Sequence, residues 1–395
     1  MNYILFDDYS RNSLLPLTFT RPTCEIRIGI MTIREKWEKH LGRPCHHITQ
    51  DYLTRKYPLK TEDRNILING SVLPDHQLVE RIQNLEPAQA LVNQDEIIAA
   101  RLSEDQIADF RSTQLRDIDI YEYEGAIFKL SHPWEIYKNN GWAIEQDFAL
   151  ITSNRQSKPV SSTNNLLGDQ KVFLEAGAKV EHATLNTTDG PIYVGADAEI
   201  MEGSIVRGPF AMGEHAVLKL AAKIYGPTTL GPFCKAGGEV NNSILSGYTN
   251  KAHEGFLGNA VLGEWCNIGA DTNNSNLKNN YATVKLWNYA QERFIDTGEQ
   301  FCGMIMGDHS KCGINTMFNT GTVVGVSANI YGEGFPRNFI PSFAWGGAKG
   351  FQEYRLNKAL EVAEKVMKRR NQTLEETEIH MFREIFERTQ KYRQF

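Results

Sequence analysis

Starting at Val194, the chain reads VGADAE, IMEGSI, VRGPFA, MGEHAV, LKLAAK, IYGPTT, LGPFCK and AGGEVN in blocks of six, to just beyond Val240. The first residue of every block is apolar, and the fifth is small or of modest size except for Phe210. A period of six matches neither the roughly 3.6 residues of a helical turn nor the alternation of a simple strand. It predicts a parallel β-helix, in which each hexad forms one flat side of a coil and its apolar residue fills the core.

The hexads continue after Val240 with a phase shift of two residues. They read ILSGYT, NKAHEG, FLGNAV, LGEWCN and IGADTN, break near residue 273, and return as MGDHSK, CGINTM, FNTGTV and VGVSAN from Met306 to Asn329. A long insertion into a regular solenoid lies on one face, which is often the face that binds a ligand. We therefore expect the excursion after Asn273 to lie beside a functional site.

The composition of the 395-residue chain is that of an ordinary globular protein, with 41% hydrophobic and 23% charged residues and a net charge of -6. The acidic balance argues against nucleic acid as the main partner, because a surface that binds phosphate backbones is usually basic. No apolar run is long enough to predict a membrane span, and the N-terminus turns acidic too early for a signal peptide. The six cysteines form no C-x-x-C pair, so we expect reduced core cysteines and a cytoplasmic protein.

The first 155 residues lack the hexad. Their pattern predicts strands at 3–6 and 65–69, weaker strands at 91–92 and 118–120, and helices at 27–41, 76–84 and 103–111. Alternating strands and helices indicate an α/β layered domain, whose ligands bind outside the carboxyl ends of the strands. Six residues are thereby placed near one candidate cleft: Asp7, Asp8, Arg11, Arg21, Asn69 and Gly70.

The tail, 351–395, changes to a helical period. One apolar stripe runs along the first expected helix, and Thr373-x-x-Glu376 is a capping box for a second. Two amphipathic helices could cover the open end of the coil or pack between subunits. With the polar stretch 153–163 as a linker, the expected domains are 1–155, 164–350 and 351–395.

The stretches NKAHEGFLG (250–258) and GEWCNIGA (263–270) carry the strongest chemical signal. His253 stands next to a corner of the coil, where the neighbouring glycines leave room for a ligand. A neutral imidazole can take a proton from an amine or a hydroxyl near pH 7. The alternative is a surface histidine that hydrogen-bonds within the coil or between subunits. Asp308-His309 is a second histidine site, which we interpret as structural.

From about residue 190 to 345 the chain resembles the acetyltransferase half of the bifunctional UDP-N-acetylglucosamine diphosphorylase / glucosamine-1-phosphate N-acetyltransferase family. That family carries K-x-x-H-x-x-Y-x-G-D-x-x-I-G-x-x-x-N-I-G-A-G-T. The residues in step with it are Lys251 or a neighbour, His253, Gly258, Gly263, Asn267, Ile268, Gly269, Ala270 and Thr272. The resemblance implies a left-handed coil and a homotrimer.

By this resemblance, His253 is the general base that activates the amine of an amino sugar 1-phosphate toward acetyl-CoA, while backbone N–H groups stabilise the oxyanion. The implied substrate contacts are Asn267, Asn276 of the N-Y-D-G position, Phe256 in place of a tyrosine, Glu239, and Lys278 or Lys285 as the basic residue. The implied contacts of the acetyl-CoA phosphates are Lys311, Arg337 and Lys349.

The N-terminal region resembles the nucleotidyltransferase half of the same family, in a divergent Bacteroidetes-type branch that starts with F-D-D and continues with L-P-L-T-x-x-R-P. The sequence FDDYSR stands where the family has a G-x-G-T-R loop. Arg11 then matches the loop arginine and Arg21 a catalytic lysine. Asn69-Gly70 stands where the family has a Gly-Asp that holds magnesium, and Asp7 and Asp8 are the candidate Mg²⁺ ligands. Alternatively, Arg21 and Asp8 merely tie the loop to the sheet.

The expected fold class is therefore an α/β nucleotidyltransferase-like domain, a left-handed parallel β-helix of hexapeptide repeats and C-terminal α-helices. Three functions stay open. The first is a bifunctional enzyme that acetylates glucosamine 1-phosphate and transfers UMP from UTP. The second is a glucose-1-phosphate thymidylyltransferase that uses dTTP and has the coil as an oligomerising scaffold. The third is a non-catalytic assembly that binds sugar nucleotides.

Overall fold

The computed structural model describes residues 1–111, 117–169 and 171–395. The chain folds into two compact units. The first comprises Met1–Leu14, Thr20–Ile26 and Met31–Ser131, and the second comprises Leu15–Phe19, Arg27–Ile30 and His132–Phe395. Residues 132–155, which the sequence groups with the N-terminal domain, thus fold with the coil.

The first unit is an α/β layer built on a six-stranded sheet with the order β4-β1-β5-β8-β7-β9. Strand β1 is parallel to its neighbours β4 and β5, whereas β8 is antiparallel to β5 and β7. The strands are β1 (Asn2–Phe6), β4 (Cys45–Ile48), β5 (Asn65–Asn69), β7 (Gln89–Asn93), β8 (Glu96–Leu102) and β9 (Asp119–Glu122), with β6 (Val72–Leu73) paired to β10 (Phe128–Lys129).

Its helices are short, and their starts follow the capping chemistry. They are α1 (Ser10–Ser13), α2 (Ile33–Leu41), α3 (His76–Gln83) and α4 (Glu104–Arg111). The helix predicted at 27–41 begins only at Ile33, because Thr32 and Glu35 form a capping box there. Before it, Met31–Thr32 form the short strand β3, whereas β2 (Arg27–Ile28) belongs to the second unit. The 3₁₀ turns in the first unit are Thr23–Glu25 and Asp51–Leu53, and those in the second unit are Leu17–Phe19 and Gln390–Tyr392.

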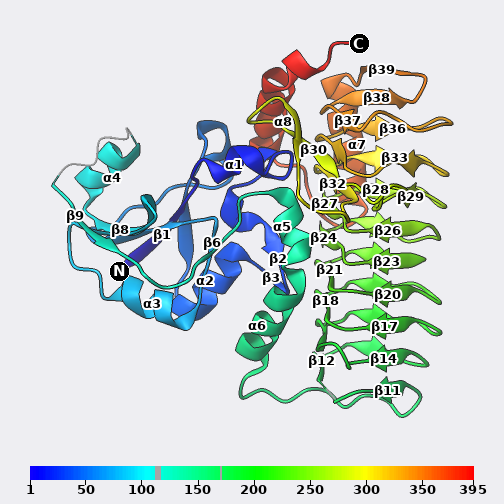
Figure 1. Ribbon diagram of the computed structural model, residues 1–395, viewed down its shortest axis with the longest axis horizontal. Coiled ribbons are helices and arrows are strands. Elements are labelled where there is room, and N and C mark those ends of the chain that lie inside the picture. Colours follow the sequence, from blue (N-terminus) through cyan, green and yellow to red (C-terminus); the bar gives the residue numbers. More distant parts are fainter. Residues whose placement is uncertain (112–116, 170) are drawn as a thin grey trace. The chain divides into compact units, whose positions relative to one another are not determined.

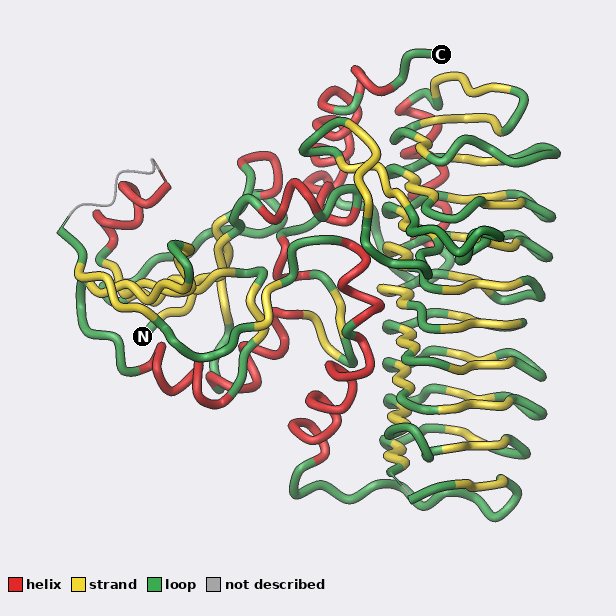
Figure 2. Tube along the Cα trace, viewed as in Figure 1, coloured by secondary structure: helices red, strands yellow, loops and turns green. Residues whose placement is uncertain are grey.

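The second unit is the predicted parallel β-helix, whose strands stack into three flat sides (Figure 1). Where the coil is regular, each turn takes eighteen residues, so that Ile192 pairs with Phe210 and Phe210 with Thr228. Loops turn the corners between the sides (Figure 2). The predicted fold class is confirmed.

Each side is defined here by its strands. Side 1 contains β11 (Asn165–Leu167), β14 (Thr184–Asn186), β17 (Ile205–Arg207), β20 (Lys223–Tyr225), β23 (Glu239–Asn241) and β26 (Phe256–Gly258). Side 2 contains β12 (Val172–Leu174), β15 (Ile192–Val194), β18 (Phe210–Met212), β21 (Thr228–Leu230), β24 (Ile244–Gly247), β27 (Val261–Glu264), β32 (Met304–Met306), β35 (Thr322–Val324) and β37 (Phe339–Ile340).

Side 3 carries the candidate site. It contains β13 (Lys179–Val180), β16 (Glu199–Ile200), β19 (Val217–Leu218), β22 (Lys235–Ala236), β25 (Asn250–Lys251), β28 (Asn267–Ile268), β33 (Lys311–Cys312), β36 (Asn329–Ile330), β38 (Ala344–Gly347) and the antiparallel β39 (Gly350–Glu353). A separate pair, β29 (Asn273–Asn274) and β34 (Met317–Phe318), is parallel.

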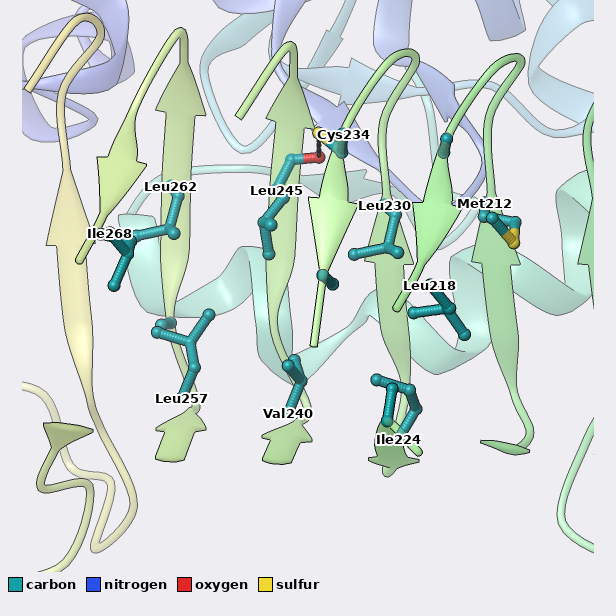
Figure 3. Close-up of a cluster of buried hydrophobic side chains, with 14 of the residues drawn as sticks. Met212, Leu218, Ile224, Leu230, Cys234, Val240, Leu245, Leu257, Leu262 and Ile268 are labelled. Carbon is teal, nitrogen blue, oxygen red and sulfur yellow. Dashed lines mark hydrogen bonds between the residues drawn. The ribbon is translucent and has the colours of Figure 1, made fainter. Parts of the chain in front are cut away.

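The core of the coil is filled as the hexads predict. First-position residues such as Leu218, Ile224 and Leu230 point inward (Figure 3), and the fifth-position residues Ala216 and Ala222 are equally buried. Fully burying one such large aliphatic side chain contributes about 1.5–3 kcal/mol. The stack of coils therefore derives its stability from these rows of side chains.

The phase shift after Val240 differs from the predicted one. The inward residues of that coil are Leu245, Lys251 and Leu257, each one residue later than the first positions read from the sequence. The predicted phase is correct again at Leu262 and Ile268. The shift places a lysine, not an asparagine, at an inward position of side 3.

The excursion after Asn273 is confirmed, and it forms a β-hairpin. Its strands β30 (Lys285–Asn288) and β31 (Arg293–Asp296) are antiparallel, and the coil resumes at β32. Four more helices belong to the second unit: α5 (Pro133–Lys138), α6 (Asn140–Thr152), α7 (Leu356–Lys368) and α8 (Glu376–Arg388).

The C-terminal helices pack on the coil through their apolar faces. Ala359, Ala363 and Met367 are buried on α7, and the ring of Phe386 on α8 lies 5.0 Å from that of Phe343 in the last coil. The predicted capping box of α8 is wrong, because Glu375 and Glu378 form it instead. No helix in the described residues of the chain is apolar over a length that could cross a membrane.

A cavity in the core of the coil should be costly. We predict that Leu230→Ala lowers the free energy of unfolding of the second unit by about 2–5 kcal/mol, because the fully buried side chain leaves a void between close-packed coils. Denaturant titration monitored by circular dichroism measures this. Ile205→Ala, on the exposed face of side 1, is the matched control, and an equal loss in both variants would contradict the prediction.

Candidate functional site

A cleft of about 790 Å³ lies between side 3 of the coil and α7, within the second unit. One wall is a column of side chains that pair directly from strand to strand, namely Lys235, Asn250, Asn267 and Lys311. The opposite wall comes from Val362 and Val366 in the apolar stripe of α7 and from Arg369 and Arg370, which directly follow this helix. The parallel register of the coil thus sets the spacing of the polar groups.

His253 lies at one edge of this cleft, in the bend from Ala252 to Gly255 between β25 and β26. Its side chain is exposed and makes no hydrogen bond to any residue that the structure describes. The bend needs a glycine at its end, because Gly255 has φ +113° and a Cβ there would lie 2.1 Å from the carbonyl oxygen of Thr272. The imidazole is therefore accessible to a ligand in the cleft.

Asn267, Gly269 and Ala270 of the quoted motif line the same cleft as His253. Gly269 permits the close stacking of this coil on the next, since a Cβ would meet the backbone of Gly313 at 2.4 Å. The motif therefore forms a compact surface next to the histidine, as the resemblance implies.

Four cations surround the cleft, and none of the described residues that line it is acidic. Arg370 donates from Nη2 to Oδ1 of Asn250 at 3.0 Å, which connects the end of α7 to side 3. Burial lowers the pKa of Lys311 to about 8, so this lysine is still charged at neutral pH. Burial, and then the positive charges of Arg370, Lys219 and Arg369, lower the pKa of Lys235. Such mutual repulsion favours the binding of an anion.

A row of stacked rings runs along one corner of the coil, and Tyr248 and Trp265 from it line the cleft. Their ring centroids are 4.1 Å apart with an interplanar angle of 10°. The row continues to His309, whose buried ring stacks on Trp265. Asp308 accepts a hydrogen bond from the backbone N–H of Glu264. The Asp308-His309 pair is thus engaged in packing and hydrogen bonding within the coil.

The other predicted acetyltransferase residues do not line this cleft. Glu239 and Phe256 are register partners on side 1, and Asn276 donates to Oδ1 of Asn259 at 2.8 Å. Lys278 and Arg337 line a second cleft of about 660 Å³ together with Lys285. Lys349 lies in a third hollow and pairs with Glu333 at 2.5 Å. The structure therefore brings together His253, Asn267 and Lys311, but not Arg337, Lys278 or Lys349.

Sequence reasoning missed Lys235, Arg369 and Arg370. The two arginines directly follow α7, and Asn250, which Arg370 contacts, lies more than a hundred residues earlier in the chain, so no local motif connects them to the histidine. The sequence feature that could have identified the two arginines is that they form an Arg-Arg pair directly after the apolar stripe of α7.

In the first unit, five of the six predicted residues gather at the carboxyl ends of β1 and β5, namely Asp7, Asp8, Arg11, Asn69 and Gly70. Asn69 donates to Oδ2 of Asp8 at 3.0 Å, and Nε of Arg11 lies 3.5 Å from Oδ2 of Asp7. Gly70 donates its N–H to the carbonyl of Phe6. Arg21 is also buried, and in the sequence it directly precedes Pro22 and the 3₁₀ turn Thr23–Glu25.

The two aspartates, as arranged, do not fit a magnesium ion. Asp7 accepts from the N–H of Thr23 at 2.7 Å and from the hydroxyl of Thr49 at 2.5 Å. Asp8 pairs with the ammonium of Lys129 at 2.8 Å, which already occupies the place of a cation. Burial raises the pKa of Asp7, whereas the charge of Arg11 lowers it to a smaller extent. The contacts of Asp8 with Asn69 and Lys129 match its part in the alternative, in which Arg21 and Asp8 tie the loop to the sheet.

Cys24, Glu25 and His47 form a cluster of metal-ligand type, but its charge is already balanced. Oε1 of Glu25 lies 2.5 Å from Nε of Arg34 and 2.9 Å from Nε2 of His47. Burial raises the pKa of the Cys24 thiol well above its usual value. We therefore interpret the cluster as an ion pair, and the six cysteines are all free and buried as predicted.

Comparison with known proteins gives a family match for the N-terminal part of the chain and a relative that covers more of it. Residues 3–156 match the family described as sugar nucleotidyl transferase. A bifunctional sugar-1-phosphate nucleotidylyltransferase/acetyltransferase from Sulfurisphaera tokodaii is 27% identical over 245 residues, which cover 60% of this chain and 53% of the relative. The chain thus spans about half the length of this relative. The N-terminal domain is of the nucleotidyltransferase type, and the chain is related to transferases.

Two solved structures are also similar. The UDP-N-acetylglucosamine acyltransferase of Arabidopsis is 12% identical with a TM-score of 0.25, and the match covers 55% of this chain and 80% of that one. The polySia-specific acetyltransferase NeuO is 12% identical with a TM-score of 0.21, and the match covers 49% and 87% of the two chains.

The ion pair of Glu25 makes the first unit sensitive to acid. Burial acts to raise the pKa of Glu25, but the hydrogen bond from His47 and the charge of Arg34 outweigh it and hold the pKa at about 2. Because this is below the unfolded value of 4.5, the stabilisation is complete above pH 4.5 and is lost as the pH falls toward 2. We predict that Glu25→Gln lowers the stability at pH 7 and flattens its pH dependence in this window. Denaturant titrations from pH 2 to 7 measure this, and parallel curves for both proteins would contradict it.

Proposed function

We propose that the chain is a bifunctional transferase of sugar-nucleotide biosynthesis. In this proposal the coil acetylates the amine of glucosamine 1-phosphate with acetyl-CoA, and the N-terminal domain transfers a uridylyl group from UTP. The observation that carries the acetyl half is the convergence of His253, Asn267 and four cations on one cleft. The family match over residues 3–156 supports the nucleotidyl half.

The acetyl step needs a base beside an anion-binding surface. The amine nitrogen attacks the thioester carbonyl, the new C–N bond forms, and the C–S bond breaks to release CoA. The imidazole of His253 accepts the proton that the amine loses and passes it to the departing sulfur. Its exposed position and the absence of a hydrogen-bond partner among the described residues leave its lone pair available.

The cations of the cleft would bind the phosphates of acetyl-CoA. Arg369 and Arg370 present guanidinium groups, which suit phosphate oxygens geometrically, and Lys235 and Lys311 add charge on the opposite wall. This assignment replaces the predicted pair Arg337 and Lys349 by residues that line the same cleft as the histidine.

For the nucleotidyl half, the buried Arg11 and Arg21 remain the proposed contacts of the triphosphate. Both are less than 10% exposed, and Nη2 of Arg11 donates to the hydroxyl of Tyr52 at 2.7 Å.

Pyrophosphate release from UTP or dTTP, measured with N-acetylglucosamine 1-phosphate and with glucose 1-phosphate, identifies the base and the sugar. Turnover of dTTP with glucose 1-phosphate and no CoA release would favour the thymidylyltransferase alternative, with the coil as scaffold. The homotrimer stays a prediction, which analytical ultracentrifugation tests.

We predict that His253→Ala lowers the rate of CoA release with glucosamine 1-phosphate by about a hundredfold or more, because the general base is lost. A thiol reagent measures the released CoA. His215→Ala is the matched control, since His215 also lies exposed at a corner of the coil but outside the cleft. Equal rates for wild type and His253→Ala would exclude this role.

We predict that Arg370→Ala raises the KM for acetyl-CoA about tenfold and changes kcat little, since one charged hydrogen bond to phosphate contributes about 1.5–3 kcal/mol to binding. The neighbouring Lys368, exposed at the end of α7 and outside the cleft, provides the control variant Lys368→Ala. Steady-state kinetics at two salt concentrations measures the effect. A KM that is unchanged in Arg370→Ala would remove α7 from the binding site.

A further inference from the structure

One inward position of the coil breaks the apolar rule, and it lies directly before the candidate base. The inward residues of side 3, from strand to strand, are Val180, Ile200, Leu218, Ala236, Lys251, Ile268, Cys312 and Ile330. Lys251 is only 2% exposed, and its neighbours in the row belong to the hydrophobic core. A charged side chain therefore occupies a place where the other coils of this row have an apolar side chain, a thiol or, at Gly346 after Ile330, no side chain at all.

The ammonium of Lys251 makes a specific set of contacts. Nζ donates to the carbonyl oxygen of His253 at 2.5 Å and to that of Gly237, on the preceding coil, at 2.9 Å. Gly238 leaves the room for it, since a Cβ there would lie 3.0 Å from Nζ. The lysine thus connects the bend that carries His253 to the coil beneath it.

These contacts are not those of a buried ion pair. No carboxylate lies within salt-bridge distance of Nζ among the described residues. Burial is the largest influence on this group and lowers its pKa to about 8, while Glu254 and Asp271 raise it and Lys223 lowers it further. Cys312, on side 3, also acts to raise it. An apolar side chain of the same length would fill the position without this desolvation cost.

The stability of the coil therefore does not account for a lysine here, whereas the position of His253 does. We propose that Lys251 is a positioning residue, which fixes the bend between β25 and β26 through the carbonyls of His253 and Gly237 and so holds the imidazole at the edge of the cleft. This inference rests on the proposed function, in which His253 accepts a proton. A displacement of about 1 Å of such a group can cost up to a hundredfold in rate.

The variant Lys251→Met tests the proposal, because it keeps the length of the side chain and removes the donors. We expect kcat for CoA release to fall tenfold or more, the KM for acetyl-CoA to stay within twofold, and the midpoint of thermal unfolding at pH 7 to rise. Ile330→Met, in the same inward row but outside the cleft, is the control for placing a methionine there, and its kcat should be unchanged.

The pH dependence of unfolding gives a second readout, which does not depend on activity. The folded pKa of Lys251 lies below the unfolded value of 10.5, so the penalty is complete below about pH 8 and disappears as the pH rises through 10.5. The thermal advantage of Lys251→Met should therefore shrink between pH 8 and 10.5.

The outcomes separate the two hypotheses. A wild type that releases no CoA overturns the proposed function. A Lys251→Met variant that is as active as an active wild type overturns only the positioning role. A variant whose melting temperature and kcat fall together also overturns it, because that pattern identifies a residue needed for folding.

Discussion

The stacking of each coil on the next is the interaction on which the rest of this chain depends. The inward apolar side chains of successive coils form one buried hydrophobic cluster, and the parallel register repeats every eighteen residues where the coil is regular. Because close-packed cores resist even small changes of volume, the flat sides can vary little in geometry. The outward residues of successive strands are consequently held at fixed spacing, and this is what aligns Lys235, Asn250, Asn267 and Lys311 in one column.

The column becomes a binding surface only through its charge. The whole chain has a net charge of -6, yet the described residues around the cleft include four cations and no carboxylate. Burial, and then the repulsion of the nearby positive charge of Arg370, lower the pKa of Lys235, and Arg370 is nevertheless held against side 3 by Asn250. A phosphate group placed between them would relieve this repulsion. The tail helices thus contribute charge to the cleft in addition to covering apolar surface.

The coil could be predicted because its six-residue period can be read directly from the sequence. The alternation of strands and helices likewise predicted the α/β fold of the first unit. The phase after Val240 was less predictable, since Ile244 and Leu245 are both apolar and only packing decides which points inward. His253 and Asn267, which the motif singles out, line one cleft, but motif matching could not place Arg369, which reaches the cleft through tertiary packing of α7. The contact of Lys129 with Asp8 could not be predicted from the sequence either, because tertiary packing also brings these two distant residues together.

The bends at the corners of the coil can differ in conformation from one coil to the next, whereas the strands of the flat sides cannot, so a reactive side chain is more easily placed at a corner. Lys251 and Lys311 show this with one device: each ammonium donates to the carbonyl of a histidine two residues away, His253 in the first case and His309 in the second. The corner of His309 continues the row of stacked rings, so its imidazole is buried in packing. The corner of His253 ends in Gly255 and leaves the imidazole exposed to the cleft. The same lysine contact therefore supports packing at one corner and, where the bend opens outward, can hold a reactive group at the other.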